Sequence, residues 1–123
     1  MGKNILAVDD SSGVRKMVKF ALKTKGHDVV TAVDGLEGLE KLMEGDYELI
    51  ILDINMPRLD GFGLLDKLKK IPEKADIPIL MLTTEGQEED KDKALRMGAN
   101  TYMVKPFKPT ELISTVEKML GNE

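Results

Sequence analysis

The stretch Leu49-Ile50-Ile51-Leu52-Asp53 decides the fold, because a continuous apolar run that ends in a carboxylate is typical of a strand buried on both faces. Stretches of helical periodicity separate this run from four others of the same kind, which are Ile5 to Val8, Val29 to Val33, Ile79 to Leu82 and Tyr102 to Val104. Strict alternation of strand and helix predicts an α/β fold, with a parallel sheet covered by helices on both faces.

Four of the helical stretches carry clear apolar stripes, which fall within Val14 to Leu22, Leu36 to Met43, Leu64 to Ile71 and Leu112 to Leu120. The stretch from Gln87 to Met97 has the weakest stripe. Helix N-caps are predicted at Ser12, Asp34 and Asp60, and His27 is expected in a solvated turn.

Composition excludes several classes of function. The 123 residues include 18 basic and 22 acidic side chains, no cysteine, no tryptophan and one histidine. Disulfides, thiol catalysis and cysteine-bound metals are therefore excluded, and nucleic-acid binding lacks both a basic surface and a stacking platform. No apolar run approaches the ~20 residues of a membrane span, and no signal peptide is recognisable, so a cytoplasmic location is expected.

Polar residues follow four of the five apolar runs, at what should be a single edge of the sheet. They are Asp9 and Asp10, then Asp53, then Thr83 with Thr84, and Lys105. Clustered carboxylates repel one another, and a hard cation such as Mg²⁺ would compensate with oxygen ligands. With a lysine nearby, such a site suits a phosphoryl group, which a carboxylate can accept as an aspartyl-phosphate.

These residues resemble a known family, the CheY-like receiver domains of bacterial two-component response regulators. The resemblance runs from Lys3 to about Leu120, on four motifs in order: Val8-Asp9-Asp10, Asp53-Ile54-Asn55-Met56-Pro57-Arg58-Leu59-Asp60-Gly61, Thr83 and Lys105-Pro106-Phe107. It implies a flavodoxin-like, doubly wound fold with sheet order 2-1-3-4-5, two helices on one face and three on the other. Because the fifth helix is expected to end near the end of the chain, we expect one stand-alone domain, 1–123, with no output domain.

The resemblance also implies roles for the residues that match these motifs. Asp53 would accept the phosphoryl group, and Mg²⁺ would be the cofactor, held by Asp10, Asp53 and the backbone carbonyl of Asn55, with Asp9 acting mostly through water. Lys105 would pair with a phosphoryl oxygen, its bond to Pro106 being cis. Thr83 would hydrogen-bond another phosphoryl oxygen, and Tyr102 would then turn inward.

One position departs from the commonest family pattern, because Thr84 stands where a very small residue is usual. We expect its extra atoms to narrow the approach of a phosphodonor or of water to Asp53. Asn55 and Glu85, two residues beyond Asp53 and Thr83, are expected to tune hydrolysis of the phosphorylated form.

The implied function is a phosphorylation-controlled switch rather than an enzyme, because the chain would catalyse only its own phosphotransfer and dephosphorylation. Its partners would be a histidine kinase or phosphotransfer protein and a downstream target, without nucleic acid or membrane, and the chain is expected to be monomeric. The fourth helix, fifth strand and fifth helix would contact the target, and chemotaxis is the most familiar case. Basic residues recur at helical spacing in the first helical stretch, at Arg15, Lys19 and Lys23. They could form an ordinary solvated face or a ridge that binds an acidic partner.

Several alternatives stay open at this point. A phosphatase of the haloacid-dehalogenase type also phosphorylates an aspartate, although it uses an Asp-x-Asp motif and a longer chain. A flavodoxin-like cofactor carrier would need a phosphate-binding loop where Asp9 and Asp10 stand. A receiver-shaped scaffold that is never phosphorylated is the third. For single residues, Asp9 could only cap a helix, and Tyr102 could be only an edge-strand aromatic.

Overall fold

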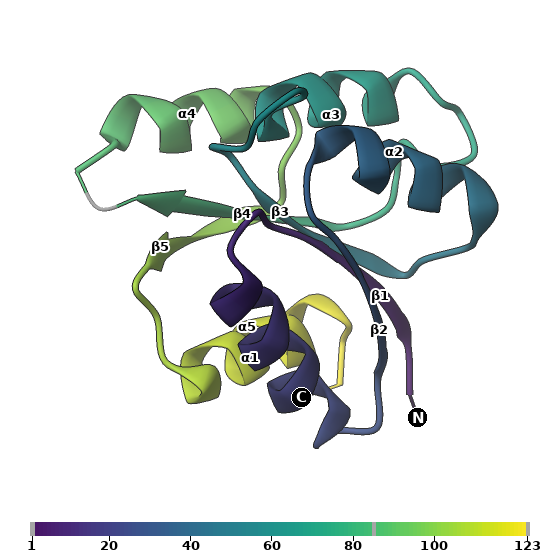
Figure 1. Ribbon diagram of the computed structural model, residues 1–123, viewed down its shortest axis with the longest axis vertical. Coiled ribbons are helices and arrows are strands. Elements are labelled where there is room, and N and C mark those ends of the chain that lie inside the picture. Colours follow the sequence, from purple (N-terminus) through teal and green to yellow (C-terminus); the bar gives the residue numbers. More distant parts are fainter. Residues whose placement is uncertain (1, 85, 123) are drawn as a thin grey trace.

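Figure 1 shows the computed structural model, a five-stranded sheet between two layers of helices, for which the structure describes residues 2–84 and 86–122. The strands are parallel and lie in the order β2-β1-β3-β4-β5. Helices α1 and α5 cover one face, and α2, α3 and α4 cover the other, which confirms the predicted arrangement. The elements are β1 (Asn4–Val8), α1 (Ser12–Lys23), β2 (Asp28–Ala32), α2 (Gly35–Glu44), β3 (Leu49–Asp53), α3 (Gly61–Lys69), β4 (Ile79–Thr84), α4 (Glu88–Arg96), β5 (Thr101–Lys105) and α5 (Pro109–Met119).

The sheet separates two apolar cores. Alternate residues of each central strand point to opposite faces, so Leu6 packs toward α2 and α3 while Ile5 packs toward α1 and α5. Strand β3 lies in the middle of the sheet, and all five of its residues are buried. Among the described residues, no helix is both long enough and apolar enough to cross a membrane.

The polar site residues of β3, β4 and β5 are the last residues of these strands, whereas Asp9 and Asp10 follow β1. Strand pairing continues through Asp53, which is opposite Leu82, and through Thr84, which is opposite Lys105. Strand geometry therefore fixes the backbone of these residues. The neighbouring strands β1 and β3 lie where the chain order reverses, the place where ligands bind in such sheets.

Two of the three predicted N-caps are confirmed and one is displaced. Asp34 Oδ1 accepts a hydrogen bond from the Glu37 amide at 2.9 Å, and Asp60 Oδ1 accepts one from the Gly63 amide at 2.8 Å. The cap of α1 is Ser11 instead of Ser12. The turn after β1 is one residue shorter than predicted.

The buried face of α2 differs from the predicted stripe. Leu36 and Met43 are exposed, at 49% and 62% of their surface, while Gly35, Gly38 and Leu42 face the core. A Cβ at Gly38 would lie 3.0 Å from side-chain atoms of both Val8 and Leu64. The absence of a side chain there lets α2 approach β1 and α3 closely, a contact that a search for large apolar residues does not find.

His27 is buried, so its predicted solvated position is wrong. Its ring is 1% exposed, with Nε2 2.6 Å from Glu117 Oε1 on α5, and Nδ1 accepts a hydrogen bond from the Lys3 amide at 3.1 Å. Because Nδ1 is an acceptor, the proton of the neutral ring lies on Nε2 and is donated to Glu117. The hydrogen bond from His27 lowers the pKa of Glu117. This pair connects the start of β2 to α5.

Helix α3 begins in direct contact with the backbone of the β3 terminus. The Gly61 amide donates to the Ile54 carbonyl at 2.8 Å, and a Cβ at Gly61 would lie 2.3 Å from the Asp53 carbonyl oxygen. Such a separation is far below van der Waals contact, so only glycine permits this approach. The start of α3 therefore helps to fix the position of Asp53.

We expect Gly61→Ala to lower the free energy of unfolding by about 2 kcal/mol, because the new methyl group must displace backbone rather than a side chain. Gly13→Ala is the matched control, since its Cβ would meet no atom closer than 3.8 Å. Alanine in that helical position should be neutral or stabilising by up to ~1 kcal/mol. Urea unfolding followed by circular dichroism measures both, and equal stabilities of the two variants would contradict the close contact at Gly61.

Candidate functional site

Three carboxylates converge at the carboxyl edge of β1 and β3. Asp9, Asp10 and Asp53 each offer an oxygen, and these atoms lie within 4.8 Å of one another. Asp9 and Asp53 are 2% and 5% exposed, whereas Asp10 is open to solvent. The Ser11 amide donates to Asp9 Oδ1 at 2.9 Å. The turn before α1 therefore fixes Asp9, and this acidic pocket combines two buried carboxylates with one at its opening.

Lys105, at the end of β5, is the cation of this cluster. Its Nζ lies 2.7 Å from Asp9 Oδ2 and 3.3 Å from Asp53 Oδ1. Burial acts to lower the pKa of Lys105, but the hydrogen bond to Asp9 and the attraction of both carboxylates outweigh it, so the pKa is raised. Lys105 is therefore a fixed positive charge beside Asp53. The peptide bond from Lys105 to Pro106 is cis.

Thr83 contributes a hydroxyl group in the penultimate position of β4. The residue is 1% exposed, and its Oγ1 has no hydrogen-bond partner in the part of the chain that the structure describes. A buried hydroxyl without a partner carries a desolvation cost of roughly 1–3 kcal/mol. An oxygen-rich group that entered the site beside Thr83 would relieve this cost.

A pocket of about 480 Å³ opens beside Lys105. It is lined by Val14 and Met17 of α1, by Thr84, and by the segment Lys105-Pro106-Phe107. Thr84 is exposed and lines this pocket with Lys105, and its effect on the approach to Asp53 stays a prediction. Asn55 is also exposed, in the loop that follows Asp53. Glu85, the other residue expected to tune rates, lies outside the described residues.

Tyr102, on β5, is 38% exposed. Lys91 of α4 lies over its ring, with Nζ 5.2 Å from the ring centroid and 2.9 Å from Glu88 Oε1. The strand register places Tyr102 opposite Met81, and Val104 opposite Thr83. The tyrosine ring and the threonine hydroxyl thus belong to adjacent strands, with the ring partly outside.

Sequence reasoning missed two polar contacts near the acidic cluster. Arg15 Nη1 donates to the Asp9 carbonyl at 2.8 Å, so Arg15 is half-buried and less free than a docking ridge requires. In the β3–α3 loop, Arg58 binds Asp34. The only signal in the sequence was the presence of charged residues near the motifs, which does not specify these pairs.

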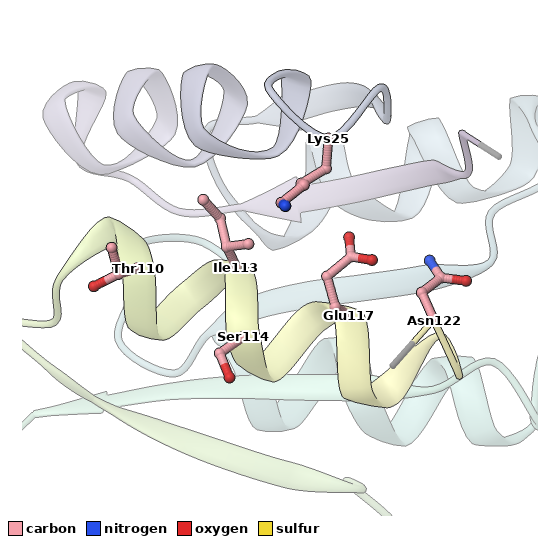
Figure 2. Close-up of a pocket in the computed structure, with 6 residues that line it drawn as sticks. All are labelled: Lys25, Thr110, Ile113, Ser114, Glu117 and Asn122. Carbon is pink, nitrogen blue, oxygen red and sulfur yellow. The ribbon is translucent and has the colours of Figure 1, made fainter.

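A second pocket, of about 460 Å³, lies along α5. Figure 2 shows Lys25 reaching from the turn after α1 toward α5, where Glu117 and Ile113 line the opening. None of its six lining residues belongs to the acidic cluster. This pocket is therefore separate from the acidic cluster at the edge formed by β1 and β3.

The pKa of Asp53 is raised to about 6. Burial is the largest cause and the negative charge of Asp9 the next, while Lys105 partly opposes both. The three oxygens are hard donors grouped within reach of a single ion, so the pocket is compatible with a divalent cation. Such an ion would remove the repulsion that raises this pKa.

In Mg²⁺-free buffer we expect Asp53→Asn to stabilise the protein above pH 6. A raised folded-state pKa means that ionisation of Asp53 opposes folding, so the gain should be absent below about pH 4, grow up to pH 6 and then level off. From the size of the shift it should be on the order of 2 kcal/mol. Thermal unfolding across pH 3.5–8 measures it.

Asp34→Asn is the control of opposite sign. The Glu37 amide and then Arg58 lower the pKa of Asp34, so this substitution should destabilise at neutral pH and lose its effect as the pH falls below 4. If Asp53→Asn and Asp34→Asn changed the free energy of unfolding in the same direction at pH 7, the conclusion that ionised Asp53 destabilises the folded protein would be wrong.

Comparisons with known proteins agree with this geometry. The family profile of the response regulator receiver domain matches residues 5–117. The chemotaxis response regulator CheY4 of Vibrio cholerae superposes with a TM-score of 0.92 at 39% identity, over 98% of this chain and 100% of that one. The match favours a receiver domain over the phosphatase and the cofactor carrier.

The curated relatives named here are regulators of transcription rather than chemotaxis proteins. The alkaline phosphatase synthesis transcriptional regulatory protein PhoP of Bacillus subtilis is 41% identical over 98% of this chain and 49% of its own length. The DNA-binding dual master transcriptional regulator RpaA of Synechocystis is 38% identical over 94% of this chain and 48% of its own length. These relatives conflict with the expectation that nucleic acid plays no part, which composition supports only for the 123 residues themselves.

The chain spans about half the length of such relatives, and its match to the family profile covers nearly all of its own. The order of the strands, the acidic pocket and the profile thus lead to one conclusion. This chain belongs to the response regulator receiver domains of two-component signalling.

Proposed function

We propose that the chain is a signalling switch that accepts a phosphoryl group on Asp53 from a phosphohistidine. The observation that carries the proposal is the surroundings of this carboxylate, which is buried beside Lys105, while Thr83 on the neighbouring strand has a buried hydroxyl without a partner among the described residues. A carboxylate at the end of a central strand has no structural need of a lysine and a free hydroxyl, whereas a phosphoryl group needs both.

In the proposed step an oxygen of Asp53 forms a bond to phosphorus while the bond from phosphorus to the imidazole nitrogen breaks. The electron pair of that bond stays on the imidazole of the donor. Lys105 offers its ammonium group to a phosphoryl oxygen, and Thr83 Oγ1 donates a hydrogen bond to another. The chain would act only on its own phosphorylation and dephosphorylation, so it is a switch rather than an enzyme with turnover of a separate substrate.

Mg²⁺ would be held by Asp10 and Asp53, with Asp9 acting through water and the Asn55 carbonyl as a further ligand. When bound, it would supply positive charge that neutralises the incoming phosphoryl group. The donor set supports this choice, because Mg²⁺ takes oxygen ligands and keeps several waters, and Asp10 leaves the pocket open on one side. Thr84 would narrow the same opening and slow the approach of donors and water.

Thr83 and Tyr102 would couple phosphorylation to the surface. A phosphoryl oxygen that recruits the Thr83 hydroxyl would move it toward Asp53, and the partly exposed ring of Tyr102 would turn into the space released. The face formed by α4, β5 and α5 would then change shape for a downstream target. Leu95 and Tyr102 are both exposed on this face, at 42% and 38%.

We expect intact mass spectrometry to show a gain of one phosphoryl group after incubation with acetyl phosphate and Mg²⁺. The gain should be absent in Asp53→Ala and lost when EDTA removes Mg²⁺, because phosphoryl charge would then be unneutralised. Asp66→Ala, an exposed acidic residue on α3, is the matched control and should be phosphorylated as fast as the wild type.

A gain that persists in Asp53→Ala would assign the acceptor elsewhere. If the wild type bound Mg²⁺ but stayed unmodified by both acetyl phosphate and a phosphohistidine donor, the chain would be a receiver-shaped scaffold instead of a switch. Steady release of phosphate from a phosphate monoester would support the phosphatase alternative.

The exposed face of α1 supports an acidic phosphodonor. Lys16, Lys19 and Lys23 are exposed there, and Phe20 between them is 75% exposed. An aromatic ring surrounded by cations suits a partner surface that is apolar at its centre and acidic at its rim. Because Arg15 is tied to Asp9, these lysines rather than Arg15 would carry the attraction.

Phosphotransfer from an acidic phosphohistidine donor should therefore slow as salt rises, and more steeply in the wild type than in Lys19→Glu/Lys23→Glu. The reason is that exposed charges accelerate association and are screened by ions. The control is Lys67→Glu on α3 together with Lys70→Glu at its C-cap, which makes the same change of charge on the other layer. Equal salt dependence in the wild type and both variants would leave α1 as an ordinary solvated face.

A further inference from the structure

The β3–α3 loop, residues 54–60, contains the one non-glycine residue with positive φ in the described chain. Arg58 has a φ of 68°, and the Leu59 amide donates to the Pro57 carbonyl at 2.8 Å. A hydrogen bond that spans one residue with such a φ marks a γ-turn, a strained conformation that persists only when its surroundings hold it. This loop starts directly after Asp53, so its strain is stored at the rim of the acidic cluster.

The side chain of Arg58 supplies the restraint. Its Nε donates to Asp34 Oδ2 at 2.7 Å, and its Nη2 donates to the same oxygen. The Asp34 side chain is 1% exposed and is itself fixed, because Oδ1 caps α2 through the Glu37 amide. A buried carboxylate with a second, fixed hydrogen bond is a rigid acceptor, so the arginine rather than Asp34 must adapt.

Backbone contacts confine the loop at the same point and at its base. The Gly35 amide donates to the Leu59 carbonyl at 3.1 Å, and a Cβ at Gly35 would lie 2.1 Å from that oxygen. At the base, the Gly61 amide closes the loop on the Ile54 carbonyl at 2.8 Å. Asn55 and Met56 therefore lie in a short segment that is restrained on both sides.

We propose that Arg58 is a positioning residue for the metal pocket: by binding Asp34 it holds the β3–α3 loop in a strained conformation beside Asp53 and thereby preorganises the pocket for a divalent cation. The proposal rests on the proposed function, because the acidic cluster is taken to hold Mg²⁺. It adds that the β2–α2 corner, through Asp34, determines how tightly that ion binds. Neither residue touches the ion.

The test is the dissociation constant of Mg²⁺, measured by isothermal titration calorimetry on the metal-free protein. We expect Arg58→Ala to raise this constant roughly 5-fold, since residues that orient metal ligands without touching the metal commonly contribute a tenfold factor or more. The matched control is Glu117→Gln, which weakens a comparable charged hydrogen bond, that to His27, in the other layer. Its Mg²⁺ affinity should equal that of the wild type.

A second variant separates positioning from stability. Arg58→Gly also loses the contact with Asp34, but glycine adopts a φ of 68° without strain. It should therefore unfold at a higher temperature than Arg58→Ala and still bind Mg²⁺ more weakly than the wild type, because glycine permits this φ but does not hold the loop at it. If Mg²⁺ affinity followed thermal stability across Arg58→Ala, Arg58→Gly and Glu117→Gln, the role of Arg58 would be merely structural and the proposal would be overturned.

A double-mutant cycle with Asp34→Asn tests whether the pair acts as one unit. Asparagine keeps the cap on α2 but removes the charge that Arg58 binds, so we expect Arg58→Ala to have little further effect on Mg²⁺ affinity in that background. An undiminished effect there would overturn the proposal. Amide hydrogen exchange of Met56 and Leu59 without metal should accelerate in Arg58→Ala and not in Glu117→Gln.

Measurements of Mg²⁺ binding and phosphorylation distinguish a failure of this proposal from a failure of the proposed function. A wild type that binds Mg²⁺ and is phosphorylated on Asp53, while Arg58→Ala binds Mg²⁺ equally well, would overturn the role of Arg58 alone. A wild type that binds no Mg²⁺ would overturn both proposals together.

Discussion

Repulsion among like charges at one edge of the sheet is the constraint on which the site depends. Asp9 and Asp53 are buried, with Asp10 close by, and among the described residues Lys105 is the cation that pairs with their carboxylates. Burial and then the negative charge of Asp9 raise the pKa of Asp53, and Lys105 offsets them only in part. The pocket is therefore compatible with a divalent cation, which would add positive charge beside these carboxylates.

The rest of the molecule holds these groups in place against that repulsion. Strand pairing continues through Asp53 and Lys105, so the two residues cannot separate without breaking the sheet. On one side the start of α3 lies against the Asp53 carbonyl, and on the other the turn before α1 binds Asp9. The apolar cores above and below the sheet supply the stability that an unfavourable cluster of charge requires.

The sequence was sufficient for the architecture and for the inner residues of the site. Apolar runs in a parallel sheet are continuous, and their ends meet at one edge, so periodicity alone predicts where Asp9, Asp53 and Lys105 converge. Residues whose position depends on tertiary contact were not predictable in this way. The residues next to His27 in the sequence predict a solvated turn, but His27 is buried in the fold. Its partner Glu117 is ninety residues away, so the local sequence does not indicate this contact.

Contacts that depend on a missing side chain, or on the direction in which a side chain points, were equally unpredictable from the sequence. The inner face of α2 includes Gly35 and Gly38 beside Leu42, and Arg58, at a positive φ, binds Asp34. Charge patterns along a chain do not encode such angles. The roles of Thr84 and Asn55 remain predictions, since the structure places them near the pocket without testing what they do.

Helix α4 contrasts with the other helices. Of its nine residues, all of which the structure describes, Ala94 alone is buried, and the helix has no side-chain N-cap. Most of its side chains therefore do not pack in the core, and they lie on the face proposed to contact a target. Mutations there can accumulate with little loss of stability, so a duplicated copy of such a domain can diverge in recognition and become insulated from its parent pathway while its phosphorylation chemistry is preserved.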